Sequence, residues 1–507
     1  MKPPASPSGC STLIRPLHHH ILRISRHQLP LNRPEAVPTP YLHGMESMVM
    51  RSENAIGDEQ PIREQLPELA PDLLRRLSAA LRLPAGQQPS WPLPDRARAA
   101  RELLSRMPPI VPPGETDELK RRLAAVAQGE AFLVQGGDCA ETFSASAEHI
   151  QGNVKTLLAM SVVLTYAADM PVAIVGRMAG QYAKPRSRAV DILGLPAYRG
   201  DIVNSPVPTP AGRTPDPDRL LGAYADACRT RNLMRAASHT PGLGDIHEVN
   251  QDFVRTSPTG SRYAPLVQDI ERALRFVAAW NTDHRDRLRT EVFTSHEALL
   301  LDYEVPLLRA TGDGSLYASS GHLLWLGERT RQFDGAHLAL AELLSNPVGV
   351  KIGPGTKPDD AIAYAERLNP EREPGRLVMI TRMGRHRIRE VLPPIVAAVT
   401  AAGHPVVWQC DPMHGNTHES PTGYKTRHFD DVLDEVRGFF EVHCRLGTHP
   451  GGIHVELTGD DVTECLGGPH QLTDADLSGR YETTCDPRLN ARQSIELAFL
   501  LAELVRR

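Results

Sequence analysis

Short apolar runs rich in valine and isoleucine recur along the chain from Phe132 onward, and segments of helical periodicity separate them. We predict eight strands from these runs: Phe132–Gln135, Val172–Val175, Val292–Ser295, Leu323–Leu326, Val348–Ile352, Leu377–Thr381, Val406–Gln409 and Ile453–Leu457. Strands that alternate with helices are typical of parallel β/α units. Eight such units close a (β/α)8 barrel (a TIM barrel), whose active site lies at the carboxyl ends of the strands.

The residues at the predicted strand ends favour a closed barrel over an open doubly wound sheet. Each strand ends in or just before a polar or charged residue, within Gly136-Gly137-Asp138-Cys139, Gly176-Arg177, His296-Glu297, Gly327-Glu328-Arg329, Lys351, Arg382, Asp411-Pro412-Met413-His414 and Glu456. An open sheet binds its ligand where the strand order reverses and does not require chemistry at every strand end. We therefore predict an α/β protein with a (β/α)8 catalytic barrel over residues 131–507.

Two further segments fall outside the repeating units. Residues 61–130 are helical and polar in pattern and are interrupted by proline-rich joints at 92–94 and 108–113, which predicts an N-terminal helical extension. The connection from about residue 180 to 290 is too long for a βα loop and has apolar residues at helical spacing (Leu266, Val267, Ile270, Leu274 and Val277). We predict a helical subdomain inserted at about 205–285, which could pack between subunits, hold a regulatory site or only stabilise the fold.

The first 60 residues have a different composition. Five basic residues (Lys2, Arg15, Arg23, Arg26 and Arg33) precede the first acidic residue, Glu35, as in organelle transit peptides. We favour the simpler interpretation, in which residues 1–60 are a disordered extension or lie partly upstream of the true start at Met45, Met48 or Met50. This segment is excluded from the fold prediction.

The overall composition limits the class of protein. Hydrophobic residues make up 41% and charged residues 23%, as in globular proteins, and the net charge of -5 argues against a nucleic-acid partner. The sequence contains no apolar run of 18 residues, so we predict no membrane-spanning helix. The seven cysteines are scattered and odd in number, which fits a reducing compartment and a cytoplasmic location.

Four dispersed residues form a candidate metal site. Cys139, His414 and Glu456 lie at predicted strand ends, and Asp486 follows the eighth unit, so a barrel would bring all four to one face. Each has a simpler explanation when considered alone, since a single cysteine is usually a buried apolar residue and a single carboxylate is usually solvated. Thiolate, imidazole and carboxylate ligands together suit a divalent transition ion such as Mn, Co, Fe or Zn.

Six basic residues form a candidate anion site. Arg177, Lys184, Arg186, Arg329, Lys351 and Arg382 all lie at or just after strand ends of a chain that is acidic overall. Guanidinium groups bind phosphate and carboxylate through two hydrogen bonds, so this set predicts a substrate with several anionic groups. In the segment Gly176–Ser187, we expect the glycines to let backbone amides approach the ligand and Ser187 to contact a phosphate oxygen.

Five longer motifs resemble those of a known family. Gln135-Gly136-Gly137-Asp138-Cys139-Ala140-Glu141, the Gly176–Ser187 segment, Trp325-Leu326-Gly327-Glu328-Arg329-Thr330-Arg331-Gln332, Asp411-Pro412-Met413-His414-Gly415-Asn416-Thr417 and Cys485-Asp486-Pro487-Arg488-Leu489-Asn490 are similar to type II 3-deoxy-D-arabino-heptulosonate 7-phosphate (DAHP) synthases. The match spans about residues 85–507. The resemblance implies a (β/α)8 barrel and a metal-dependent transferase, 3-deoxy-7-phosphoheptulonate synthase, that catalyses the first step of the shikimate pathway toward aromatic amino acids.

The resemblance also implies roles for individual residues. The metal ligands would be Cys139, His414, Glu456 and Asp486, with Mn²⁺ the first choice and Co²⁺, Fe²⁺, Zn²⁺ or Cd²⁺ the alternatives. Phosphoenolpyruvate would contact Arg177, Glu328, Arg329, Lys351 and Arg382, whereas erythrose 4-phosphate would contact Lys184, Arg186 and Ser187. The catalytic residues would be Lys184, Arg177 and His414. The family further implies a homo-oligomer, dimer or tetramer, and aromatic amino acids as allosteric effectors.

The implied reaction is an aldol-type condensation. The metal would polarise the aldehyde while the methylene carbon of phosphoenolpyruvate attacks it, and addition of water with loss of phosphate would make the step irreversible. Lys184 and a metal-bound water are both candidates for protonating the aldehyde oxygen. Two alternatives stay open: a related metal-dependent aldolase with another acceptor, and a non-catalytic sensor of aromatic metabolites.

Overall fold

The computed structural model describes residues 57–239, 243–280 and 290–505. Its helices are α1 Glu59–Gln65, α2 Pro71–Leu81, α3 Pro94–Ser105, α4 Pro113–Ala127, α5 Ala147–Ala168, α6 Pro210–Arg213, α7 Arg219–His239, α8 Leu243–Thr256, α9 Ala264–Trp280, α10 Leu301–Glu304, α11 Ala336–Ala341, α12 Pro358–Leu368, α13 Ile388–Ala401, α14 Phe429–Leu446 and α15 Ala491–Val505. The expectation for residues 1–60 falls almost entirely outside the described residues.

Eight parallel strands form a closed barrel, which confirms the predicted fold class. The strands are β1 Phe132–Gly137, β2 Val172–Gly176, β3 Val292–Glu297, β6 Leu323–Leu326, β7 Val348–Ile352, β8 Leu377–Thr381, β9 Val406–Cys410 and β12 Gly452–Glu456. They pair in the order β1-β12-β9-β8-β7-β6-β3-β2. Each predicted run corresponds to one of these strands, and the last strand begins and ends one residue earlier than predicted.

Alternation along the strands separates two apolar layers. In β1, Leu133 points into the barrel and joins the interior cluster with Trp325 and Phe293, whereas Phe132 and Val134 pack outward against the surrounding helices. The interior cluster also contains Leu119 and Leu123 of α4. Helix α4, within the predicted N-terminal extension, therefore packs against one end of the barrel interior and completes its core.

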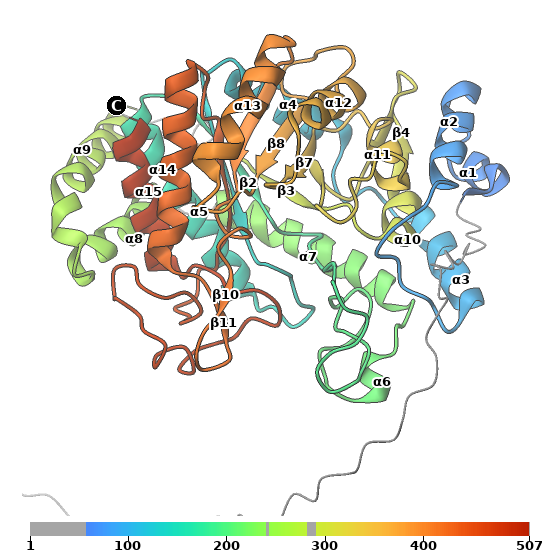
Figure 1. The fold of residues 1–507 in the computed structure, drawn as a ribbon, viewed down its shortest axis with the longest axis horizontal. Coiled ribbons are helices and arrows are strands. Elements are labelled where there is room, and N and C mark those ends of the chain that lie inside the picture. Colours follow the sequence, from blue (N-terminus) through green and yellow to red (C-terminus); the bar gives the residue numbers. More distant parts are fainter. Residues whose placement is uncertain (1–56, 240–242, 281–289, 506–507) are drawn as a thin grey trace, which may run out of the picture. The chain divides into compact units, whose positions relative to one another are not determined.

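The remaining helices surround the barrel (Figure 1). Helices α13, α14 and α15 pack in sequence against one another, and α15 also packs along α5. The prolines of the two predicted joints begin α3 at Pro94 and α4 at Pro113, where proline costs no intrahelical hydrogen bond. Helices α1 and α2 share an apolar cluster with α11 and with β4 Leu308–Ala310 and β5 Leu316–Ala318.

Helices α6 to α9 occupy the long connection between β2 and β3. Helices α7 and α8 pack against α5, and Phe253 and Tyr263 stack on Phe499 of α15 at centroid distances of 5.6 and 4.5 Å. The apolar spacing predicted at residues 266–277 corresponds to α9. Among the described helices, none is both long and apolar enough to cross a membrane.

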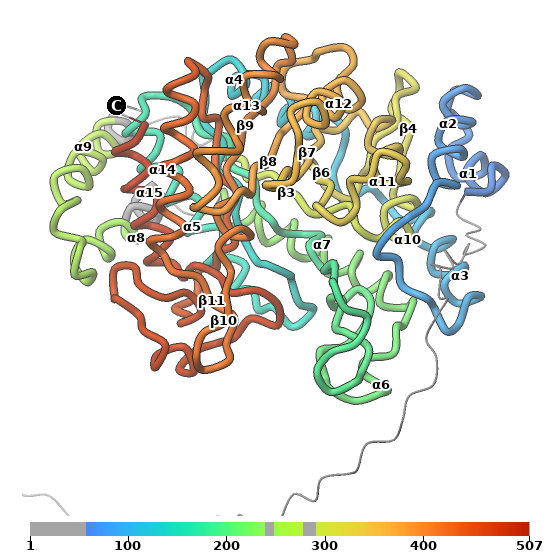
Figure 2. Tube along the Cα trace, viewed as in Figure 1, coloured from blue at the N-terminus to red at the C-terminus, as the bar shows by residue number. Residues whose placement is uncertain are grey.

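Two long loops meet at the carboxyl ends of the strands. The loop after β9 contains the short pair β10 His418–Glu419 and β11 Lys425–Thr426, and the loop after β12 runs to α15. They join through Leu466 N–H, which donates to Arg427 O at 2.8 Å, and Thr426 Oγ1, which donates to Glu464 O at 2.9 Å. Figure 2 shows these two loops side by side beyond the barrel. They carry His414 and Asp486 of the predicted metal site.

Candidate active site and metal centre

A pocket of about 740 Å³ opens at the carboxyl ends of the barrel strands. Its lining includes all six basic residues of the predicted anion site, together with Ser187, Glu328, His414 and Asp486. These residues come from six different loops and strand ends, so only the closure of the barrel brings them together. The functional role of each residue stays a prediction.

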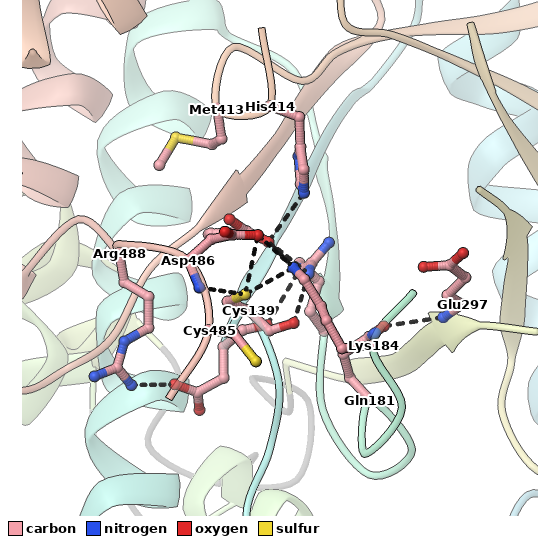
Figure 3. Close-up of polar contacts among 12 residues, drawn as sticks. Cys139, Gln181, Lys184, Glu297, Met413, His414, Cys485, Asp486 and Arg488 are labelled. Atoms are coloured by element: carbon pink, nitrogen blue, oxygen red, sulfur yellow. Dashed lines mark hydrogen bonds and ion pairs between the residues drawn. The ribbon is translucent and has the colours of Figure 1, made fainter. Parts of the chain in front are cut away.

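Figure 3 shows three of the predicted metal ligands, Cys139, His414 and Asp486, close together, and His414 and Asp486 line the pocket. One ligand atom each from Cys139, Glu456 and Asp486 lies within 4.8 Å of the other two. His414 joins them through Nε2, which is 3.1 Å from Glu456 Oε1. Cys139 and Glu456 are buried, which limits competition from water for the same atoms.

The ligand atoms are arranged around a positive charge. Lys184 Nζ lies 2.8 Å from Cys139 Sγ, 2.8 Å from Asp486 Oδ2 and 3.6 Å from Glu456 Oε1. Cys139, Asp486 and Glu456 therefore all lie around the ammonium group of Lys184. A thiolate, an imidazole and two carboxylates are also a donor set of mixed softness that transition ions accept, so the residues present fit a divalent metal.

Two charged residues outside the predicted set orient these ligands. Asp411 Oδ2 lies 2.7 Å from His414 Nδ1, which leaves Nε2 to face Glu456. Arg427 is fully buried, and its NH2 lies 2.8 Å from Glu456 Oε2. Carboxylates that hold a ligating histidine through its other nitrogen are common around metals. The acid three residues before His414 was the available sequence signal for Asp411, but nothing near Arg427 distinguished it from a surface arginine.

The charge state of Cys139 predicts how metal binding depends on pH. Burial, the hydrogen bond with Cys485 and the negative charge of Glu456 raise the pKa of the Cys139 thiol well above its usual range. The thiol is therefore protonated at neutral pH, and a metal ion that binds the thiolate must displace that proton.

We expect metal affinity to rise with pH, by up to about tenfold per pH unit while the thiol remains protonated. Competition with a chromophoric chelator, at a series of pH values on either side of neutrality, measures this slope. An affinity that is independent of pH would show that the Cys139 proton is not displaced.

The side chains predicted to bind phosphoenolpyruvate line the barrel mouth beside the metal ligands. The Arg177 guanidinium and Lys351 Nζ lie over the Trp325 ring, 5.1 and 5.9 Å from its centroid. Arg177 NH2 donates to Glu456 Oε1 at 3.2 Å, and Arg382 NH2 donates to the His414 carbonyl at 3.0 Å. Trp325, which the sequence did not single out for a role, therefore forms an aromatic floor beneath two cations.

Glu328 and Lys351 are held by neighbouring charges. Glu328 Oε1 accepts from Arg331 NH2 at 2.5 Å, and Glu328 Oε2 is 3.9 Å from Arg382 NH1. Lys351 Nζ donates to Asp411 Oδ2 at 2.5 Å, and burial lowers the pKa of Lys351 in spite of that carboxylate. Glu328 thus holds Arg382, and Asp411 holds Lys351, in place within the pocket.

Two of the residues predicted to bind the sugar phosphate, Arg186 and Ser187, line the same pocket. Arg329 NH2 donates to Ser187 Oγ at 2.6 Å, so the predicted Ser187 contact and the Arg329 contact are adjacent. Arg186 Nε donates to the Tyr198 carbonyl at 2.5 Å, and its NH2 lies 3.6 Å from Cys485 Sγ. Arg329, a predicted phosphoenolpyruvate contact, therefore lies beside Ser187, a predicted sugar-phosphate contact.

The structure corrects the prediction for the glycine-containing segment. The backbone N–H groups of Ala179, Gly180 and Gln181 donate to the carboxylate of Glu141 at 2.8, 2.9 and 2.7 Å. These amides are therefore not directed at a ligand. Gly180 is required for a different reason, since a Cβ there would lie 2.3 Å from His296 Nδ1.

Glu297 is a further carboxyl in the pocket wall that the sequence analysis did not select. Its backbone N–H donates to Gln181 Oε1 at 2.9 Å, while its side-chain Oε1 is buried without a hydrogen-bond partner among the described residues (Figure 3). Burial raises the pKa of Glu297, although Lys351 and Lys184 oppose the shift. Its position after His296 at the end of β3 was the only sequence signal.

A (β/α)8 barrel with a cationic pocket beside a cluster of thiol, imidazole and carboxylate groups defines an enzyme for anionic substrates with a candidate metal centre. Comparison with known proteins specifies the family. The model of the class-II DAHP synthetase family matches residues 76–502, and the chain therefore belongs to that family.

Two relatives match at high identity over nearly their whole length. The chain is 58% identical over 450 residues to phospho-2-dehydro-3-deoxyheptonate aldolase AroG of Mycolicibacterium smegmatis, covering 87% of this chain and 97% of that protein. It is 56% identical over 432 residues to phospho-2-dehydro-3-deoxyheptonate aldolase of Streptomyces coelicolor, covering 84% and 96%. A solved structure of phospho-2-dehydro-3-deoxyheptonate aldolase from Francisella tularensis shares 14% identity at a TM-score of 0.44, covering 80% of this chain and 97% of that one.

Proposed function

We propose that this pocket condenses phosphoenolpyruvate with erythrose 4-phosphate and water to give DAHP and phosphate, the first step of the shikimate pathway. Membership of the class-II DAHP synthetase family supports the reaction. The observation that carries the residue assignment is the set of six basic side chains in one pocket, next to a thiol and two carboxylates whose ligand atoms lie within 4.8 Å of one another. The comparisons support neither alternative, an aldolase with another acceptor or a non-catalytic sensor.

Phosphoenolpyruvate would bind over Trp325, where Arg177, Arg329, Lys351 and Arg382 offer charges to its carboxylate and phosphate. Two of these cations are buried, and buried charges bind anions more strongly than solvated ones. Their existing carboxylate partners fix their positions before the substrate arrives, so less entropy is lost on binding. The main contribution of these residues is to hold two mutually repelling anions in a reactive orientation.

Erythrose 4-phosphate would bind with its phosphate at Arg186 and Ser187 and its aldehyde toward Lys184. Burial alone would lower the pKa of Lys184, but the carboxylates of Asp486 and Glu456 raise it well above its usual range. Lys184 is therefore protonated and is suited to donate a proton to the aldehyde oxygen. Glu297, whose pKa burial raises, is the carboxyl placed to accept a proton from the water that adds later.

Cys139, His414, Glu456 and Asp486 would hold the divalent ion, which supplies Lewis-acid polarisation of the aldehyde when it is bound. The buried thiol favours a transition ion over magnesium or calcium, which prefer oxygen ligands. We propose Mn²⁺ first, with Co²⁺, Fe²⁺, Zn²⁺ and Cd²⁺ as alternatives that the same donor set accepts.

Loss of phosphoenolpyruvate in the presence of erythrose 4-phosphate is the decisive assay. We expect consumption only when both substrates are present, and we expect a chelator to lower the rate by about 100-fold or more because aldehyde polarisation is lost. Each of the five ions is then returned to the chelated protein to rank them. Activity with another aldose phosphate but not erythrose 4-phosphate would exclude the proposed acceptor, and full activity in chelator would exclude the metal.

Regulation, assembly and location are further parts of the proposal. We propose aromatic amino acids as effectors, a homo-oligomer of two or four chains, and a cytoplasmic location. Repeating the assay with each aromatic amino acid tests the first, and light scattering of the purified protein tests the second.

A further inference from the structure

Two buried glutamates lie behind the pocket, each with its carboxylate bound by backbone amides of a loop that carries predicted substrate contacts. Glu141 follows β1, and Glu435 lies on α14. Both side chains are buried, and no ion pair of either is found within the described residues. Burial raises the pKa of Glu141 to about 7 and that of Glu435 to about 8, while the hydrogen bonds from the loops favour the charged form. A buried carboxylate without a counter-ion is costly unless hydrogen bonds satisfy it fully.

Glu141 holds the loop after β2. Its Oε1 accepts from Ala179 N–H, and its Oε2 accepts from Gly180 and Gln181 N–H, at 2.7 to 2.9 Å. Its own backbone N–H donates back to the Gln181 carbonyl at 2.8 Å. Ala179 has a φ of 63°, a left-handed conformation that non-glycine residues rarely adopt. The carboxylate therefore stabilises a turn that the sequence alone does not favour.

This turn lies between a predicted phosphoenolpyruvate contact, which precedes it in the chain, and the predicted erythrose 4-phosphate contacts, which follow it. Arg177 lies immediately before it, and Lys184, Arg186 and Ser187 follow within a few residues. Arg177 is also fixed by Glu456 and by the carbonyls of Asp138 and Cys139, so it does not depend on the turn. The residues after the turn, which are the predicted contacts of erythrose 4-phosphate, depend on it most.

Glu435 holds the loops after β8 and β9 in the same way. Its Oε1 accepts from Met383 N–H at 2.8 Å and Gly384 N–H at 2.9 Å, and its Oε2 accepts from Asn416 Nδ2 at 2.7 Å. The two loops touch through glycines, since a Cβ on Gly415 would lie 2.4 Å from Gly384 N. Arg382, a predicted phosphoenolpyruvate contact, immediately precedes the first of these amides.

We propose that Glu141 and Glu435 are positioning residues that divide the active face, with Glu141 placing the erythrose 4-phosphate contacts and Glu435 placing the phosphoenolpyruvate contacts. The division rests on the proposed function for the identity of the two substrates. The holding of the two loops rests only on the hydrogen bonds described above.

The isosteric variants Glu141→Gln and Glu435→Gln test the proposal. A carboxamide keeps the shape but turns one oxygen into an N–H donor that faces the loop amides, so the turn loses acceptors. We expect Glu141→Gln to raise KM for erythrose 4-phosphate by about fivefold or more and to leave KM for phosphoenolpyruvate within about twofold. We expect Glu435→Gln to show the reverse selectivity. Equal changes in both KM values, or a fall in kcat with both KM values unchanged, would overturn the division.

Amide hydrogen exchange provides a measurement that does not depend on activity. We expect the amides of residues 179–181 to exchange about tenfold faster or more in Glu141→Gln alone, and those of 383–384 in Glu435→Gln alone. Unchanged exchange in both variants would overturn the role of the carboxylates. If the wild-type protein did not condense the two substrates, the proposed function would be wrong. The hydrogen-exchange rates of the two loops would still test whether Glu141 and Glu435 hold them.

Two further variants complete the design. Glu496→Gln removes a buried carboxylate on α15, outside the pocket lining, and is expected to leave both KM values and both loops unchanged. Selective effects in this control would overturn the proposal. If Glu141→Gln does not fold, Glu141→Asp withdraws the carboxylate by one methylene and must show the same KM selectivity, and an equal rise in both KM values would overturn it.

Discussion

Cys139→Ser is expected to lower the affinity for the divalent metal by about 100-fold or more and to reduce kcat/KM by a similar factor. The serine hydroxyl does not ionise at neutral pH, so the substitution removes a charged, soft ligand from a donor set that otherwise contains only nitrogen and oxygen atoms. Titration of the chelator-treated protein with metal, followed by equilibrium dialysis, measures the affinity independently of turnover.

The neighbouring thiol of Cys485 gives a matched control. Cys485 packs against Cys139 in one small cluster. It is not one of the three residues, Cys139, Glu456 and Asp486, whose ligand atoms lie within 4.8 Å of one another. Cys485→Ser is expected to keep metal affinity within about threefold, because an outer contact is altered while the ligands remain. A Cys139→Ser protein that binds metal normally would exclude Cys139 as a ligand, and an equal loss in both variants would indicate a general disturbance of the loop.

The barrel could be predicted from sequence because its signal is local and repeated. Eight apolar runs of four or five residues were enough to place the strands, and their ends then located the pocket residues. The β4–β5 hairpin was missed even though Asp313-Gly314 is a turn signal, because its strands span only three residues each and lie within a longer connection. Strand length, rather than composition, limited this part of the prediction.

The candidate site was predictable only where side chains follow strand ends. Cys139, Lys351 and Arg382 satisfy that rule. Glu435 does not, since it lies on an amphipathic helix, where a glutamate is usually solvated and nothing local indicates that it reaches the loops after β8 and β9. Glu141 was present in a recognised motif, but its acceptance of three amides depends on a turn between Ala179 and Gln181 that is set by tertiary contacts.

Arg427 is likewise a buried charged residue that no local sequence signal identifies, and it forms a buried ion pair with Glu456. Arg427 and Glu456 are both fully buried, with NH2 and Oε2 2.8 Å apart. Arg427 Nε also donates to Thr417 Oγ1 at 2.9 Å, and its NH1 donates to the Pro487 carbonyl, next to Asp486. It thus links the two loops that carry His414 and Asp486 to the carboxylate at the end of β12.

Arg427→Met is expected to lower the free energy of unfolding by about 3–5 kcal/mol, because removal of one partner leaves the Glu456 charge buried and only partly compensated. Arg389→Met is the control: Arg389 pairs with Asp434 and Glu441 at the surface, with its side chain 40% exposed, and such pairs contribute about 0–1 kcal/mol. Urea titration of both variants against wild type measures the difference. Equal losses in the two variants would show that the buried pair contributes no more than a surface one, and that His414, Lys184 and Arg177 suffice to compensate Glu456.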